Sequence, residues 1–229
     1  MRKTKSLYLH EEVLLLALRD REGTVASGSM FTYAMGGAVL SELLLRERVA
    51  VDESSKKKLL NVIDSSPIGD PPLDDCLNRM ATAKRRANMQ GWVSKFANTR
   101  GFKEWVAKGL CRRGILKADE DTVLLFFKQK IYPEINSVPE RAIIERLRRA
   151  IFTDTSDIDA RTLVLVSLAN SSGLLNMVFE KRDLKNRKAR LKKLAAEQPA
   201  GKATAQAIAA VQAALIASMI MTTTVIHSR

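Results

Sequence analysis

Residues 161–179, RTLVLVSLANSSGLLNMVF, decide the fold of this sequence, and they carry no charge after Arg161. The stretch is too long for one strand, and its apolar residues fall on every face of a helix instead of one stripe. Such a helix is buried on all sides. We therefore predict a mainly α fold: a helical domain around a buried apolar helix at about 161–179, with one or two small β-hairpins. Asp157 or Asp159 is expected to cap the start of this helix.

The composition is that of a globular protein, with 46% hydrophobic and 28% charged residues in a chain of 229. This length can bury a core without disulfides, and we expect one domain over 1–229, with a flexible segment at 1–6 and a basic helix or loop at 181–202. Cys76 and Cys111 lack metal-binding spacing and suit a reducing compartment. Glu11 and Glu12 interrupt the first apolar run too early for a secretion signal, so we expect a cytoplasmic protein.

The net charge of +13 indicates a partner that is nucleic acid or an anionic membrane surface. Much of it lies in one short run, where only Asp183 opposes the cations Lys181, Arg182, Lys185, Arg187, Lys188, Arg190, Lys192 and Lys193. Within this run we select Lys185, Lys188 and Lys192 as a basic surface. A solvated helix face without a partner is the alternative interpretation.

Residues 122–135, TVLLFFKQKIYPEI, predict a β-hairpin with a strand at 123–127, a turn at 128–130 and a return strand that Pro133 ends. Its apolar residues, Leu124, Leu125, Phe126 and Phe127, are candidates for contact with lipid or with another subunit. Packing against the core is the alternative. The helix that opens at Pro139 is expected to carry Arg141, Arg146, Arg148 and Arg149 on its exposed side.

The uncharged segment 203–226 is long enough to cross a membrane, but it is mostly alanine with several Thr, Ser and Gln residues. Its transfer to lipid would therefore be weakly favourable, and we predict a final core helix.

No set of residues predicts catalysis. The two histidines, His10 and His227, lie in the terminal segments without a spacing that suits zinc or a nucleophile pair. A glycine-rich phosphate loop is absent from the sequence. Asp70, Asp74 and Asp75 stand where a helix begins and are expected to be caps. We therefore expect no enzyme, no cofactor and no metal.

Six stretches occur in the order typical of one known family: LYLHEEVLLLALRDREG, GGAVLSELLLRERV, SSPIGDPPLDDCL, KEWVAKGLCRRGIL, LLFFKQKIYPEIN and DARTLVLVSLANSSGLLNMVF. Together they cover most of residues 7–179, and the chain resembles the Golgi phosphoprotein 3 family. The resemblance implies a helical domain with small hairpins that acts as a peripheral membrane adaptor. It also implies binding of phosphatidylinositol 4-phosphate, contact with the cytosolic tails of membrane proteins, and homo-oligomers.

The resemblance also implies site residues. It places the lipid headgroup at Arg100 and Lys103, before the helix equivalent to 104–111. Gly36 stands where the family has another Arg, and Ser27 lies near the position of its Trp. These departures, and the lack of a long disordered N-terminal tail, favour a bacterial-type relative, located in the cytoplasm; a eukaryotic one would lie on the cytosolic face of the Golgi.

A nucleic-acid-binding protein of the winged-helix type is the alternative. A helix followed by RRGIL and an apolar hairpin fits that motif, and the basic run at 181–193 could lie along phosphates. Against this, no helix presents the Arg, Asn and Gln cluster that reads bases.

Overall fold

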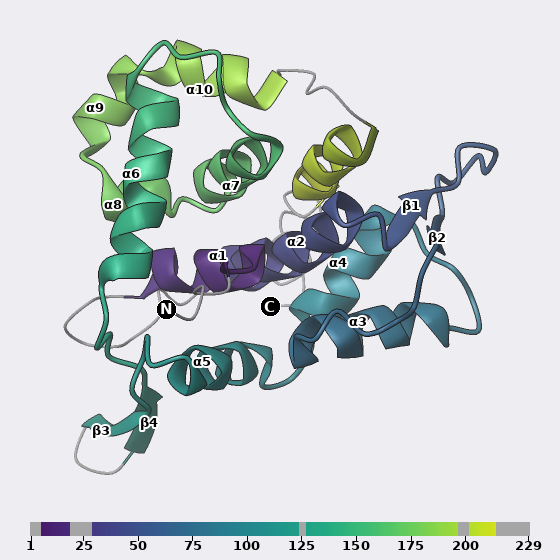
Figure 1. The fold of residues 1–229 in the computed structure, drawn as a ribbon, viewed down its shortest axis with the longest axis horizontal. Coiled ribbons are helices and arrows are strands. Elements are labelled where there is room, and N and C mark those ends of the chain that lie inside the picture. Colours follow the sequence, from purple (N-terminus) through teal and green to yellow (C-terminus); the bar gives the residue numbers. More distant parts are fainter. Residues whose placement is uncertain (1–5, 19–28, 124–126, 197–201, 214–229) are drawn as a thin grey trace, which may run out of the picture.

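The computed structural model describes residues 6–18, 29–123, 127–196 and 202–213, which are mainly helical with two small antiparallel sheets (Figure 1). The first half contains α1 (Leu9–Ala17), α2 (Ser29–Leu45), β1 (Val49–Val51), β2 (Leu60–Val62), α3 (Pro71–Ala81), α4 (Met89–Ala97) and α5 (Phe102–Arg112). The second half contains β3 (Asp119–Val123), β4 (Phe127–Ile131), α6 (Val138–Phe152), α7 (Ala160–Ser171), α8 (Leu175–Val178), α9 (Lys181–Asn186) and α10 (Lys188–Ala196). The predicted fold class is confirmed.

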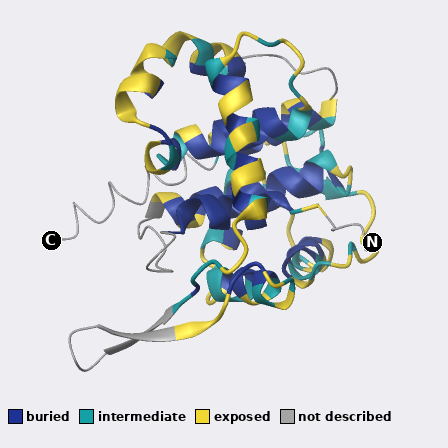
Figure 2. Cartoon of the chain, turned by 60° about the vertical axis from the view of Figure 1, so that its left-hand side comes forward, coloured by how far each residue is buried: buried dark blue, intermediate teal, exposed yellow. Residues whose placement is uncertain are grey.

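The centre of the molecule is α1, which is buried along its whole length, including its three polar residues. It packs against α2, α5, α6 and α7, and Figure 2 shows the buried residues running through the middle of the body. One continuous cluster of buried apolar side chains extends from Tyr8 to Val211. The elements that carry surface charge are therefore fixed to a common core.

The buried apolar helix predicted at 161–179 is present as α7, and residues 162–169 are buried. Asp159 caps it, since its carboxylate accepts a hydrogen bond from the backbone N–H of Thr162 at 2.9 Å. The helix ends at Ser171 because Gly173 adopts a φ of +78°, which the left-handed turn requires. The chain then forms the short helix α8, so the expectation of one helix through residue 179 was wrong.

The predicted β-hairpin is also present, but its register differs from the expectation. β3 and β4 pair from Asp119 opposite Ile131 to Val123 opposite Phe127. The strands therefore meet at 124–126, and the predicted strand at 123–127 with a turn at 128–130 was wrong. The apolar run predicted a strand that starts at Val123, whereas the β3–β4 ladder also includes the polar residues before it, with Glu120 opposite Lys130.

The closing segment is helical at 202–213, with Ala207, Ile208, Ala210 and Val211 buried. Ser41 of α2 donates a hydrogen bond to the carbonyl of Ala207 at 3.0 Å, which fixes this helix to the core. Within the described residues, no helix is both long and apolar enough to cross a membrane. The rest of the predicted helix, and His227, lie outside the described residues.

Candidate functional site

The turn between α4 and α5 holds both residues that the resemblance assigns to the lipid headgroup. Gly101, with a φ of +71°, lets the chain leave α4 and enter α5. Arg100 is exposed in this turn. Lys103 lies inside the first turn of α5 instead of before it; its side chain is 33% exposed, and Nζ lies 3.6 Å from Oε1 of Glu104. Both cations therefore reach solvent at one turn of the chain.

A cation that the sequence did not indicate joins this turn from α3. Arg79 Nη1 donates to Oγ1 of Thr99 at 2.7 Å, and Nη2 donates to the carbonyl of Lys95 at 3.4 Å. Lys95 is exposed, with Nζ 4.1 Å from the centre of the Trp92 ring. Asp75 lies 3.8 Å from Arg79 and offsets part of the charge. We refer to Arg79, Lys95, Arg100 and Lys103 as the α4–α5 cationic surface.

Gly36 is a packing residue of α2 and not part of an open surface. A Cβ added there would lie 2.6 Å from the carbonyl O of Val93 and 3.0 Å from the backbone N of Ala97, both in α4. The glycine therefore permits the close approach of α2 and α4, and a longer side chain would not fit without moving them. Ser27 lies outside the described residues.

The β3–β4 hairpin projects from the body below α5 (Figures 1 and 2). Leu124, Leu125 and Phe126 lie outside the described residues, and Phe127 is the first residue of β4. Of the four apolar residues, the structure therefore places only Phe127.

The basic run at 181–193 forms α9 and α10, and its cations divide into two kinds. Arg187 and Arg190 fold back onto the end of α6 and the residues after it: Arg187 donates to the carbonyl of Phe152, and Arg190 donates to the carbonyl of Ala150 at 3.1 Å. The exposed charged residues of this run are Lys181, Arg182, Asp183, Lys185, Lys188, Lys192 and Lys193. The three selected lysines are thus all in solvent.

The structure brings some of these predicted features together and separates others. The hairpin and α5 lie at the lower end of the molecule in Figure 1, whereas α9 and α10 cover the upper end. Figure 2 shows the same separation after rotation. Lys185, Lys188 and Lys192 therefore do not belong to the surface that carries Arg100 and Lys103.

A network of buried ion pairs surrounds α1, and the sequence analysis missed it. Glu11 pairs with Arg113 at 2.7 Å, and Glu42 of α2 pairs with Arg161 at 2.9 Å. Glu12 pairs with Arg146 of α6 at 2.9 Å, so the expectation of an exposed Arg146 was wrong. Burial raises the pKa of Glu12, although Arg161 and Arg146 act against this shift. These pairs tie α1 to α6 and to the end of α5, and they tie α2 to α7.

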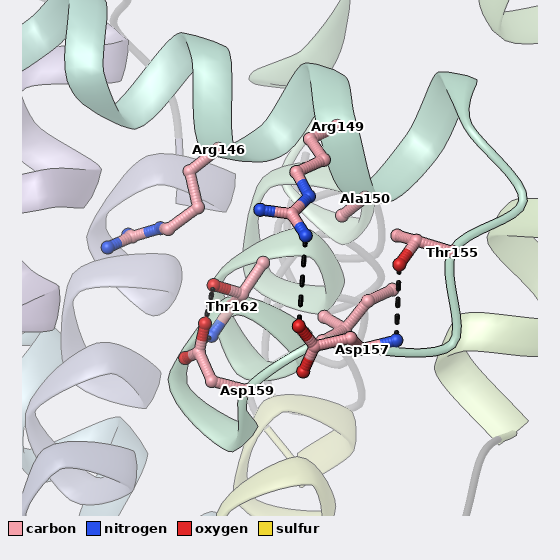
Figure 3. A pocket seen from close by; sticks show the side chains of 8 residues that line it. Arg146, Arg149, Ala150, Thr155, Asp157, Asp159 and Thr162 are labelled. Atoms are coloured by element: carbon pink, nitrogen blue, oxygen red, sulfur yellow. Dashed lines mark hydrogen bonds and ion pairs between the residues drawn. The ribbon is translucent and has the colours of Figure 1, made fainter.

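Two hollows border this network. A cleft of about 630 Å³ has apolar walls from the start of α6, but its arginines, Arg113, Arg146 and Arg161, already face carboxylates. A smaller pocket further along α6, which Arg146 also lines, holds Arg149 3.7 Å from Asp157, next to the capping pair of Asp159 and Thr162 (Figure 3). Neither hollow offers cations free for an anionic ligand.

The described residues that could carry chemistry have structural roles. Asp70 caps α3 by accepting from the N–H of Leu73, and Asp74 accepts from the N–H of Ile68 at 2.6 Å. His10 is buried in α1 with Nε2 3.3 Å from Asp70. Burial raises the pKa of Cys76 to about 12, which keeps the thiol protonated. No group of His, Cys, Asp or Glu in the described parts of the chain could hold a metal ion.

Comparison with known proteins gives a family. The sequence model of the Golgi phosphoprotein 3 (GPP34) family matches residues 9–211. The chain is also similar to vacuolar protein sorting-associated protein 74 of Eremothecium gossypii, with 28% identity over 214 aligned residues that cover 78% of this chain and 64% of the relative. The chain thus spans just under two-thirds of the length of that relative. Neither comparison supports a bacterial-type origin.

Proposed function

Because this chain belongs to the Golgi phosphoprotein 3 family, as the six stretches predicted, we propose that it is a peripheral membrane adaptor that binds anionic lipid through the α4–α5 cationic surface. The family is one of non-enzymatic adaptors. The observation that carries the proposal is that Arg100 and Lys103 both reach solvent at the turn into α5, the helix that lies with the β3–β4 hairpin at the lower end of the molecule in Figure 1.

The electrostatics suit reversible attachment. Each Lys or Arg near an anionic leaflet contributes about 1 kcal/mol, so the four cations of the surface attract lipid without anchoring the protein. The sequence that joins β3 to β4 is apolar, and we propose that it enters the membrane interface. Apolar side chains that enter the interface add about 1.5–3 kcal/mol each, which would convert attraction into stable but reversible binding.

The finer part of the proposal is the lipid. By family resemblance the headgroup is phosphatidylinositol 4-phosphate, whose monoester phosphate suits a guanidinium beside an ammonium. Arg100 can hold two phosphate oxygens, whereas Lys103 acts as a point charge. Since Gly36 packs against α4, no third cation comes from that position, and we propose a weaker preference for this headgroup than a site with three arginines would give.

The cellular role follows the family in the same way. We propose that the protein acts in the cytoplasm, at the cytosolic face of the Golgi in a eukaryotic cell, and that it holds membrane proteins by their cytosolic tails. Leu124, Leu125, Phe126 and Phe127 are proposed to contact lipid or a second copy of the chain.

The test is co-sedimentation with liposomes of matched charge, containing either phosphatidylserine or phosphatidylinositol 4-phosphate. The double substitution Arg100→Glu with Lys103→Glu is expected to weaken binding roughly 30-fold or more, since it removes two contacts of about 1 kcal/mol and adds repulsion. The matched control is Lys185→Glu with Lys188→Glu, which changes the net charge by the same amount at the other end of the molecule and is expected to leave binding nearly unchanged.

Equal losses from both double variants would mean that only net charge matters, and would remove Arg100 and Lys103 from the site. Tighter binding to phosphatidylinositol 4-phosphate than to phosphatidylserine at equal charge would support headgroup recognition. Affinity for duplex DNA at physiological salt that exceeds the affinity for liposomes would favour the nucleic-acid alternative instead, which no feature of the described residues supports.

A further inference from the structure

A pocket of about 450 Å³ lies between β2 and the end of α3, on the opposite side of the molecule from the β3–β4 hairpin (Figure 1). Its walls include Val62, Ile63, Met80, Ala83, Arg86 and Trp92. None of these residues belongs to the α4–α5 cationic surface or to α9 and α10. The pocket is therefore a feature that the proposed lipid binding does not use.

One wall of the pocket is the free edge of a strand. The backbone N–H of Leu60 donates to the carbonyl of Ala87 at 2.9 Å, away from β1, whereas the N–H of Ile63 donates to Arg48 at 2.8 Å on the other side. Because alternate residues of a strand direct their amides to the same side, the N–H and C=O of Val62 face away from β1. No hydrogen bond to this outer side of Val62 occurs within the described residues. Along this outer edge of β2, backbone hydrogen bonding to a neighbouring segment therefore ends at Leu60.

One residue that lines the pocket carries a polar group that lacks a partner. Trp92 is 2% exposed, and its Nε1–H is buried without a hydrogen-bond acceptor among the described residues. A buried donor without an acceptor is unfavourable, and a ligand whose carbonyl oxygen reached this donor would relieve it. Ile63, at the rim, is 62% exposed although its neighbours in the strand are partly or fully buried. The site therefore combines an apolar pocket with a buried N–H donor that lacks a hydrogen-bond acceptor.

The chain segment next to the pocket is basic. Ala83 and Arg86 line the pocket, and between them in the sequence Lys84 and Arg85 are exposed, with no ion pair to either among the described residues. Arg86 is already held by Asp52 at 2.8 Å and by the side chain of Asn61. Two unpaired cations thus lie within two residues of the pocket lining, and they complement an acidic ligand.

We propose that this pocket and the edge of β2 bind an extended segment of a partner protein that carries an apolar residue beside acidic ones. The segment continues the β1–β2 sheet at Val62, places its apolar side chain on Met80 and Trp92, and directs a carboxylate toward Lys84 and Arg85. Main-chain hydrogen bonds of this kind give affinity, while the pocket and the charges give specificity. This second binding surface adjoins the α4–α5 cationic surface at Lys95, which lies over the Trp92 ring, but it does not include Arg100 or Lys103.

The test uses a library of random peptides displayed on phage, selected against the full chain without lipid. Selected peptides are expected to share an apolar residue flanked by Asp or Glu, without proline at the centre. Their affinities are then measured by fluorescence anisotropy. Lys84→Glu with Arg85→Glu is expected to weaken binding at least tenfold, whereas the control Lys56→Glu with Lys57→Glu, exposed between the strands of the same hairpin, is expected to change it less than twofold.

Two further variants locate the contact. Val62→Pro removes the outward N–H without breaking a bond to β1, which an edge strand tolerates, and is expected to weaken binding at least tenfold. In a Trp105→Phe background Trp92 is the only tryptophan, and its emission is expected to shift when peptide binds. The proposal is overturned if no common pattern is selected, if selected peptides bind the Lys84 and Arg85 variant unchanged, or if the emission of Trp92 stays constant. Liposome binding is unaffected by any of these outcomes, so the two proposals fail separately.

Discussion

The cations around α1 and those along α9 and α10 show two opposite uses of positive charge. Around α1, Arg113, Arg146 and Arg161 pair with carboxylates that are almost fully buried. Along α9 and α10, Lys185 and Lys188 are exposed, and no described residue forms an ion pair with them. The comparison teaches that net charge alone does not locate a binding surface, because some of the cations hold the fold together. Only cations that no buried carboxylate holds are candidates for an external anion.

The largest effect is expected when one arginine of the buried network is removed. Arg161→Ala removes the ion pair with Glu42 at 2.9 Å, where only Arg46 at 2.6 Å then remains, removes one of the two arginines near Glu12, and removes the donor to the carbonyl of Leu7. A buried charge that loses its last partner costs about 3–5 kcal/mol. Because Glu42 and Glu12 each keep one arginine, we expect the free energy of unfolding, measured with urea, to fall by about 2–4 kcal/mol.

The matched control for this variant is Lys188→Ala, which removes one cation from an exposed position. Substitutions at such positions change stability by less than about 0.5 kcal/mol. Similar losses from Arg161→Ala and Lys188→Ala would break the distinction between the two regions, because they would show that the buried pairs contribute no more than surface charges do.

A smaller effect concerns the buried carboxylate itself and depends on pH. Burial raises the pKa of Glu12 above 4.5, the ordinary value for this group. Between the ordinary pKa of the unfolded chain and the raised pKa of the folded protein, the folded protein binds a proton that the unfolded chain has lost. The stability of the wild type therefore falls as pH rises through that window. Glu12→Gln cannot titrate. The stability of the wild type minus that of the variant is therefore expected to decrease as pH rises above about 4.5.

Asp159 is expected to give a pH dependence of stability with the opposite sign. Although burial opposes the shift, hydrogen bonds from Thr162 lower the pKa of Asp159 below 3.8. Its stabilising contribution is present above this value and is lost as pH falls through the folded pKa, so the difference between the wild type and Asp159→Asn is expected to increase with pH. Urea unfolding from about pH 3 to pH 8 measures both slopes. A rising difference for Glu12→Gln would mean that its ion pairs outweigh the effect of burial.

The contrast between the two regions also shows which parts of the molecule the sequence could predict. The core helix α7 and its cap Asp159 follow from an uncharged run after an acidic residue, and both are local signals. The pairing of Arg146 with Glu12 is not local, since periodicity places Arg146 on the polar side of α6 without saying what faces it. Arg79 escaped notice for the same reason, because its contact with Thr99 depends on how α3 packs beside α4.

Local signals also competed with one another. The small residues at 171–173 mark the end of α7, but the apolar residues after them suggested that the helix continued. In the hairpin, the apolar run at 124–127 suggested a strand because its residues favour β-structure, whereas in the ladder β3 ends at Val123 and β4 begins at Phe127. In both places the tertiary arrangement decided between two plausible local readings.

The smallest effect on stability is expected from the lysines, and it sharpens the comparison within a single segment. The triple substitution Lys185→Gln, Lys188→Gln and Lys192→Gln removes three exposed charges and is expected to change the free energy of unfolding by less than about 0.5 kcal/mol for each lysine. Arg190→Gln removes only one charge from the same segment, yet it takes the donor away from the carbonyls of Ala150 and Thr155. Hydrogen bonds from a charged group contribute about 1.5–3 kcal/mol, so this single variant is expected to lose more stability than the triple one. Urea unfolding of both variants measures which of the two is less stable. If the triple variant were the less stable, the lysines would have partners in the fold, and the exposed charge at this end of the molecule would no longer be free for an external anion.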